Sequence, residues 1–202
     1  MHSDDAPRFN FTIGCVPVKF VWFRVAKCGT RSTLALLRQH VTEFQIEQGF
    51  NRLYPRKELL DYTKFSVVRN PYTRIVSGWN DKIRLNKSGG PRLTEGQKTK
   101  MQDFDYFVEW LVDQPKRTVD IHLRPQSLLV PHDVHEIGHI ENLDHDLCRI
   151  LKRAGFPDIK EVPHKNKKWV PKETYQFNAR ILKLINDYFE SDFERFGYKM
   201  RT

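Results

Sequence analysis

The chain has 202 residues, a formal net charge of +9 at pH 7 and a pI near 9.5. This length predicts a single domain over residues 1–202 with a real hydrophobic core, and residues 1–10 are expected to be flexible. The ordinary apolar content and the lack of a long apolar run exclude a disordered chain and a membrane span, while the charge predicts an anionic ligand without choosing among nucleotides, acidic sugars, nucleic acid and membrane surfaces.

The chain carries three cysteines, Cys15, Cys28 and Cys148. Three cysteines leave one unpaired and are too few for a dense disulfide framework, so they favour a reducing compartment. We therefore expect a cytoplasmic protein.

The first informative stretch runs from Phe20 to Leu34. A short edge strand interrupted by Pro17 is expected before it, at Phe11 to Val18. An apolar run from Phe20 predicts a buried strand, and the helical pattern that follows predicts a helix from Arg31 to about His40. The loop between them is rich in cations and hydroxyls. Backbone N–H groups at a helix start have no partner within the helix, so this strand, loop and helix predict an anion cradle.

The next region, Val41 to Tyr62, has a mixed pattern. Pro55 suits the first turn of a helix, so a short helix is expected at Pro55 to Tyr62.

A second junction of strand and helix follows at Lys64 to Trp79. Phe65 to Val68 predicts a buried strand, and Asn70 followed by Pro71 predicts the cap and first residue of a helix. Arg69 lies at the carboxyl end of the strand, and Ser77 lies about two turns into the helix. Because ligands of open parallel sheets bind outside the carboxyl ends of the strands, we expect both junctions to open onto one crevice.

Together the two junctions resemble the sulfotransferase family, in particular its carbohydrate sulfotransferase branch. Members carry a 5′-phosphosulfate loop after the first strand, matched here by residues 26–33, and a 3′-phosphate motif of arginine, seven residues and serine, matched by Arg69 to Ser77. Residues 120–126, 137–147 and 188–198 also resemble segments of this branch. The resemblance implies an α/β, P-loop-kinase-like three-layer fold with a central, mainly parallel sheet.

The resemblance also implies the donor and the acceptor. The donor is 3′-phosphoadenosine 5′-phosphosulfate, which leaves as 3′-phosphoadenosine 5′-phosphate, and the acceptor is a hydroxyl of a carbohydrate or another small polar molecule, anionic or neutral. No nucleic acid partner is implied. If the chain is an excised part of an anchored protein, the Golgi lumen replaces the cytoplasm as the expected location.

The resemblance assigns most of the site residues. Lys27 is expected to stabilise the charge on the leaving phosphate, since a sulfuryl transfer, like a phosphoryl transfer, builds charge there. The residues expected to bind the donor are Lys27, Cys28, Gly29, Thr30, Arg31, Ser32, Thr33, Arg69 and Ser77.

The acceptor hydroxyl needs a general base. His122 is the first choice, because imidazole titrates near neutrality and the segment matches the acceptor side of the family. Arg124 and Gln126 are expected to orient the acceptor or to support His122. The alternative bases are His40, Glu43 and Glu47.

No metal is expected. The spacing of His132, His135, His139 and His145, with Cys148 nearby, could place zinc ligands on one helical face, but the intervening residues read at least as well as a strand.

Three later segments complete the pattern. Leu85 to Lys100 predicts a long polar loop, Phe104 to Leu111 shows the spacing of a core helix, and Pro171 is expected to start a final helix. The basic segment His164 to Trp169 is expected either to cover the nucleotide, to meet an anionic acceptor, or to be a solvated loop.

Two other functions remain open. A P-loop kinase is disfavoured because its phosphate loop places lysine after the second glycine, whereas Lys27 precedes Gly29 here. A basic nucleic-acid-binding module would explain the charge, but the sequence has no helix-turn-helix, zinc-finger or RNA-stacking signature.

Overall fold

The computed structural model describes residues 7–15, 18–40, 46–85, 90–157, 159, 161–163 and 176–202. The chain divides into two compact units. The first unit comprises Met1–Val68 and Leu129–Lys167, and the second comprises Arg69–Leu128 and Lys168–Thr202.

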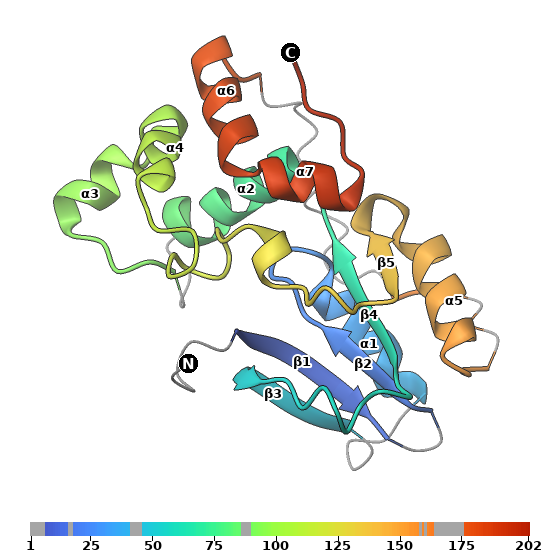
Figure 1. The fold of residues 1–202 in the computed structure, drawn as a ribbon. Coiled ribbons are helices and arrows are strands. Elements are labelled where there is room, and N and C mark those ends of the chain that lie inside the picture. Colours follow the sequence, from blue (N-terminus) through green and yellow to red (C-terminus); the bar gives the residue numbers. More distant parts are fainter. Residues whose placement is uncertain are drawn as a thin grey trace. The chain divides into compact units, whose positions relative to one another are not determined.

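The first unit is built on a five-stranded sheet (Figure 1). Its strands are β1 (Arg8–Gly14), β2 (Phe20–Phe23), β3 (Ile46–Leu53), β4 (Thr63–Val68) and β5 (Glu136–His139), in the order β3-β1-β2-β4-β5. β2 pairs with β4 and β4 with β5 in parallel, whereas β1 is antiparallel to both of its neighbours. Four strands therefore share one direction, which confirms a mainly parallel α/β sheet.

The strand β2 is buried on both faces, as its apolar sequence predicts. Val21 and Phe23 lie on one face with the apolar side chains of β1, where Phe23 packs edge-on against Phe11 at 6.2 Å. Trp22 lies on the other face and stacks on Phe65 of β4 at 6.3 Å. Since residues along a strand alternate between faces, one strand joins two apolar layers.

Three expectations for the first unit are wrong. The first strand is not at an edge, because β1 lies between β2 and β3; it also begins at Arg8, within the segment expected to be flexible. The mixed region contains the edge strand β3, which was not predicted. Residues 56–60 form turns rather than a helix after Pro55. Pro17 lies outside the described residues.

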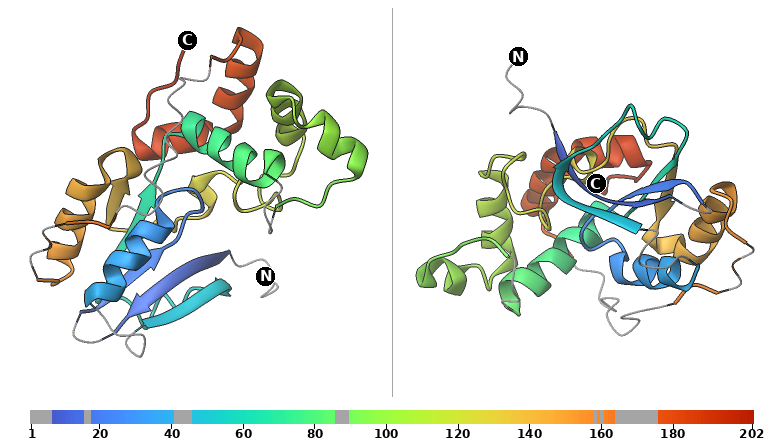
Figure 2. Two further views of the ribbon diagram at one scale, coloured as in Figure 1. Left: turned by 180° about the vertical axis from the view of Figure 1, so that it is seen from behind. Right: turned by 90° about the horizontal axis from the view of Figure 1, so that it is seen from below.

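Two helices lie next to each other on the first unit's sheet (Figures 1 and 2). Helix α1 (Thr30–His40) follows the loop after β2, as predicted. The 3-10 turn η5 (Ile140–Asn142) and helix α5 (Leu143–Arg153) follow β5, and α5 packs on β4 and β5. A Cβ atom on Gly138 of β5 would lie 3.2 Å from Ile150 of α5, so glycine permits this close packing.

The second unit is helical. It contains α2 (Pro71–Trp79), the π-helix η3 (Asn80–Arg84), α3 (Glu95–Lys100), α4 (Phe104–Val112), the 3-10 turn η4 (Gln126–Leu128), α6 (Ala179–Tyr188) and α7 (Glu190–Phe196). The predicted start of α2 is confirmed: Asn70 caps it by accepting a hydrogen bond from the backbone of Tyr72 at 3.0 Å, and Pro71 occupies the first turn. Within the described residues of both units, no helix is long and apolar enough to cross a bilayer.

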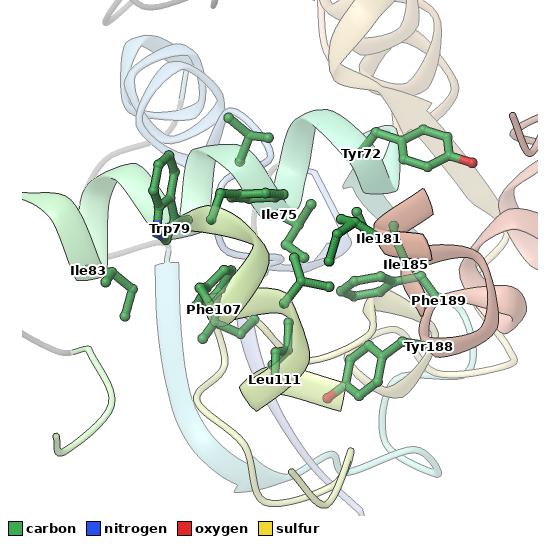
Figure 3. Packing of buried hydrophobic residues seen from close by; sticks show 14 of the residues in the cluster. Tyr72, Ile75, Trp79, Ile83, Phe107, Leu111, Ile181, Ile185, Tyr188 and Phe189 are labelled. Carbon is green, nitrogen blue, oxygen red and sulfur yellow. The ribbon is translucent and has the colours of Figure 1, made fainter. Parts of the chain in front are cut away.

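The core of the second unit joins α2, α4, α6 and α7 (Figure 3). Phe107 and Leu111 of α4 are fully buried among Ile75 of α2 and Ile181 and Ile185 of α6. The helical spacing of α4 therefore reports core packing, as expected from the sequence.

Two boundaries in the second unit differ from expectation. The predicted polar loop at Leu85 to Lys100 contains α3, which starts with a capping box between Thr94 and Gln97. The final helix expected from Pro171 corresponds to two helices: α6 begins at Ala179 behind the cap Asn178, and α7 follows it, whereas residues 176–178 are not helical. Pro171 and the basic segment 164–169 lie outside the described residues.

The buried ring of Phe107 gives a test of the helical core. We expect Phe107→Ala to lower the free energy of unfolding by about 3–5 kcal/mol, because it removes a fully buried ring and leaves a cavity. Urea unfolding monitored by circular dichroism measures the change. Tyr106→Ala on the exposed face of the same helix is the matched control, and equal losses in the two variants would contradict this packing.

A second test concerns Glu136 of β5, which forms ion pairs with Arg149 and Arg153 of α5. Burial opposes its ionisation, but the hydrogen bonds from the two arginines outweigh burial and lower its pKa from 4.5. A carboxyl with a lowered pKa stabilises the fold above the unfolded value, and this stabilisation is lost as the pH falls through the folded value. We therefore expect Glu136→Gln to be less stable than the native protein at pH 7, with the difference shrinking below about pH 4.5.

Thermal unfolding at several pH values measures this difference. The control is Glu58→Gln in an exposed turn. A loss of stability in Glu136→Gln that is the same at acid and neutral pH would rule out the ionic contribution.

Candidate functional site

The loop between β2 and α1 has a conformation suited to an anion. Lys27 and Gly29 are both left-handed, with φ of 71° and 72°. Left-handed backbone is strained for lysine by about 1–3 kcal/mol and is found mainly where function requires it. Alternation of this kind turns successive N–H groups inward, and α1 has no acidic residue in its first turn. The loop thus offers backbone donors to a negatively charged group.

Several side chains of this loop bind the loop itself. The Thr30 hydroxyl donates to the carbonyl of Val25 at 3.1 Å, and the buried Cys28 thiol donates to the carbonyl of Ala26 at 3.6 Å. The hydroxyl oxygen of the fully buried Thr33 has no hydrogen-bond partner among the described residues. Thr30 and Cys28 therefore shape the loop, and their backbone groups are what they can offer a ligand.

The loop rests on the start of α5. A Cβ atom on Gly29 would lie 3.4 Å from Leu143 and 3.6 Å from Ile140. The strands β2, β4 and β5 are parallel, so their carboxyl ends lie at the same end of the sheet. The loop follows β2 there, and Val68 and His139 are the last residues of β4 and β5. Arg31, by contrast, is exposed, and Ser32 is buried in the first turn of α1.

The second predicted motif begins the second unit. The Nε of Arg69 donates to the Thr73 hydroxyl at 2.9 Å, which fixes the plane of the guanidinium. The backbone of Arg69 forms two hydrogen bonds with the amide of Gln126, from its N–H at 2.9 Å and to its carbonyl at 2.8 Å. Both bonds make the position of Arg69 independent of any ligand.

The two residues expected to orient the acceptor make other contacts. Gln126 is fully buried, and its Nε2 also donates to the Asp192 carboxylate at 3.3 Å, so in this structure its amide binds Arg69 and Asp192. The guanidinium of Arg124 donates twice to the carbonyl of Val119, at 3.0 and 3.2 Å, and burial lowers its pKa. Arg124 therefore closes its own loop.

Asp192 of α7 anchors the segment that carries Gln126. It is fully buried and accepts hydrogen bonds from the backbone N–H groups of Gln126 at 2.8 Å and Ser127 at 2.7 Å. The sequence gives little sign of this role, because Asp192 stands among the charged residues of an amphipathic helix.

The segment that carries His122 packs on α2 beside Ser77. A Cβ atom on Gly78 would lie 3.1 Å from the carbonyl oxygen of His122, a tight contact, so glycine favours this close approach. Arg74, one turn earlier and almost fully buried, donates to the carbonyls of Arg124 at 2.8 Å and Ile121 at 3.2 Å. The second unit thus brings the backbone of His122 next to Gly78, the residue after Ser77.

The side chain of His122 has one close partner. Its Nδ1 lies 2.7 Å from Oδ1 of Asp120, and its backbone N–H donates to the same oxygen at 2.9 Å. Burial raises the pKa of Asp120, but the hydrogen bonds from His122 and the charge of Lys82 outweigh it and lower that pKa overall. Asp120 was not singled out from the sequence, although its spacing of two residues from a candidate base was the available signal.

The alternative bases lie in the first unit. His40 ends α1, where its ring packs edge-on against Phe156 at 6.2 Å. Glu47 lies on the edge strand β3, opposite Ile13 of β1. Glu43 lies outside the described residues.

The candidate metal ligands are spread over several elements. His135 accepts a hydrogen bond from the backbone of Lys64, His139 ends β5, and His145 and Cys148 lie on α5 beside a cavity of about 330 Å³. Across the described part of the chain, no three histidine, cysteine or acidic residues are grouped so that they could hold a metal ion.

Comparison with known proteins gives the family. The model of the sulfotransferase family matches residues 15–199. The chain is 27% identical to carbohydrate sulfotransferase 10 of Rattus norvegicus, over 75% of this chain and 51% of that protein. It is 26% identical to carbohydrate sulfotransferase 10 of Homo sapiens, over 85% of this chain and 58% of that protein.

A third relative broadens the comparison. Carbohydrate sulfotransferase 14 of Danio rerio is 27% identical, over 72% of this chain and 46% of that protein. The chain thus spans about half the length of the curated relatives it matches, and these matches lend no support to a cytoplasmic location. No solved structure gives a significant match. Because the family model covers nearly the whole chain, including the loop after β2 and the segments of Arg69 and His122, the chain belongs to the sulfotransferase family.

Proposed function

We propose that the protein transfers a sulfuryl group from 3′-phosphoadenosine 5′-phosphosulfate to a hydroxyl of a carbohydrate. The observation that carries the proposal is the loop after β2, in which the left-handed Lys27 precedes a helix without acidic residues in its first turn. The relatives named above are carbohydrate sulfotransferases, which supports a carbohydrate acceptor. A P-loop-kinase-like arrangement of the sheet is part of the same proposal.

The residues of the loop fit a phosphosulfate group. Its backbone donors and the positive end of α1 suit an oxyanion. Lys27 is half-buried, so its ammonium acts in a medium where charge interactions are stronger than in bulk water. Lys27 is therefore assigned to the charge that builds on the leaving phosphate, and Arg31, Ser32 and the loop backbone to the other oxygens.

Arg69 and Ser77 are assigned to the 3′-phosphate. Arginine suits a phosphate because its planar guanidinium donates in parallel to two oxygens. The bond from Nε of Arg69 to Thr73 orients that guanidinium before a ligand arrives, and the bond from the backbone N–H to Gln126 holds the main chain. Pre-organisation of this kind reduces the entropy lost on binding.

His122 is assigned as the general base. When bound, 3′-phosphoadenosine 5′-phosphosulfate supplies the sulfuryl group. His122 takes the proton of the acceptor hydroxyl as the acceptor oxygen bonds to sulfur, and the electron pair of the broken sulfur–oxygen bond remains on the 5′-phosphate. Lys27 balances the charge that the phosphate gains.

A kinase using ATP is the less favoured alternative. Its lysine follows the second glycine of the loop, whereas Lys27 lies two residues before Gly29.

The role of Lys27 gives the main test of the function. We expect Lys27→Ala in the full protein to lower kcat by about 10²–10³ at saturating donor, because it removes the cation assigned to the leaving group. Transfer of labelled sulfate to carbohydrate acceptors measures the rate. Lys57→Ala in an exposed turn is the control and retains native kcat. If Lys27→Ala instead keeps native kcat and raises the donor KM, Lys27 only binds the donor and does not stabilise the leaving group.

The role of Arg69 is tested by binding alone. We expect Arg69→Ala to weaken binding of 3′-phosphoadenosine 5′-phosphate by about tenfold or more, because a charged hydrogen bond is lost, and to leave binding of adenosine 5′-phosphate almost unchanged. Isothermal titration calorimetry measures both ligands.

The control is Arg180→Ala, which removes an exposed cation of α6. Equal weakening of the two ligands by Arg69→Ala would show that Arg69 does not recognise the 3′-phosphate. Stabilisation of the native protein by ATP with magnesium, but not by the bisphosphate, would argue for a kinase.

A further inference from the structure

We propose that Asp120 is the positioning residue of the general base: it holds the imidazole of His122 with the proton on Nδ1, so that the lone pair of Nε2 is presented to the acceptor hydroxyl. This inference rests on the proposed function, in which His122 takes that proton. Asp120 itself touches neither donor nor acceptor.

The hydrogen-bond geometry carries the inference. Oδ1 of Asp120 lies 2.7 Å from Nδ1 of His122. An ionised carboxylate only accepts hydrogen bonds, so Nδ1 must be the protonated nitrogen of a neutral ring and Nε2 the one with the lone pair. A base needs its lone pair on the nitrogen that faces the reacting proton. The contact therefore selects the tautomer that a base at Nε2 requires.

The backbone fixes both partners in place. The N–H of His122 donates to the same carboxylate oxygen at 2.9 Å, and the carbonyl of Asp120 accepts from the N–H groups of Leu123 and Arg124, both at 2.9 Å. Arg74 holds the carbonyls on either side of His122, at Ile121 and Arg124. The backbone of His122 is consequently held by a closed turn, with its carbonyl close to Gly78 of α2, and the ring itself is held by its contact with Asp120.

The hydrogen bonds from His122, with a smaller contribution from the charge of Lys82, outweigh burial and favour the ionised form of Asp120. The side chain of Asp120 is only 16% exposed, so an isolated carboxylate would be costly there. The positive charge of Lys82, on the π-helix η3, acts on the carboxylate, and Arg124 of its own turn interacts with it as well. π-Helical turns are uncommon and are often found at functional sites. Here η3 carries the lysine that balances Asp120.

A purely structural role for Asp120 makes a different prediction. Asparagine can still accept the backbone N–H of His122, so Asp120→Asn keeps the turn. Its amide can also donate to Nδ1, which favours the tautomer protonated at Nε2 and leaves no lone pair for the acceptor. If Asp120 only closes the turn, Asp120→Asn changes neither the ring nor the rate.

The first measurement reads the tautomer directly. In the full protein labelled with ¹⁵N-histidine, nuclear magnetic resonance at about pH 8.5, where imidazole is neutral, distinguishes a protonated from an unprotonated ring nitrogen. The signals of His122 are assigned by their loss in His122→Gln. We expect a proton on Nδ1 in the native protein and on Nε2 in Asp120→Asn. A native ring protonated at Nε2 overturns the proposal without the need for any variant.

The second measurement is kinetic. We expect Asp120→Asn to lower kcat by about 10² with an acceptor KM within about threefold of native, because the ring remains but its lone pair is misplaced. Asp120→Glu, which restores a carboxylate, recovers part of kcat. The matched control is Asp113→Asn at the exposed end of α4, with native kcat, and thermal unfolding confirms that each variant is folded.

The outcomes separate this inference from the proposed function. Native kcat in Asp120→Asn together with inactive His122→Gln overturns the role of Asp120 and leaves His122 as the base. Native kcat in His122→Gln removes the base assigned in the proposed function, and the role of Asp120 falls with it. A loss of kcat in Asp120→Asn without a change of tautomer also overturns the positioning mechanism.

Discussion

The parallel pairing of β2 with β4 is the constraint on which the first unit depends. Each of the four residues of β2 is almost fully buried, and the strand supplies apolar side chains to both faces of the sheet. Burial of four large side chains resists any shift of register, since a one-residue slip would exchange the two faces. The loop after Phe23 is therefore held at the carboxyl edge of the sheet, and the strained backbone of Lys27 is supported by a strand that cannot move away.

In the second unit, buried polar groups hold a predicted site residue, Arg69, in position. Asp192, Gln126 and Arg69 form a chain of hydrogen bonds in which each buried group is satisfied by a backbone partner. Breaking such a chain leaves a buried carboxylate or amide without a partner, which costs more than the bond contributes when formed. In this network Gln126 holds the backbone of Arg69. It fixes Arg69, which directly precedes Asn70, the cap of α2.

The sequence predicted those features that depend on local rules. Asn70 and Pro71 predict the start of α2, because asparagine is a common helix cap and proline suits the first turn. The apolar runs of β2 and β4 are long enough to be recognised as buried strands. The strand β3 was missed because Gln48, Gly49 and Asn51 are poor strand formers; β3 lies at an edge and depends on its pairing with β1. Pro55 predicted a helix because proline is common in the first turn of helices, whereas the residues after it form turns.

For the site, the pattern of cations and hydroxyls in the loop after β2 could be recognised in the sequence. The contacts of Gln126 with Arg69 and Asp192 could not, because they join residues up to 66 positions apart and no local pattern encodes them.

The net charge of +9 says less about the site than the positions of individual cations do. In total it predicted only an anionic ligand. In the structure, Lys82 and Arg124 of the second unit each interact electrostatically with Asp120. A carboxylate beside a site for a multiply charged anion would repel that anion unless nearby cations balance it. In the proposed function the cations therefore have two tasks: Lys82 offsets the charge of Asp120, and Lys27 and Arg69 attract the donor.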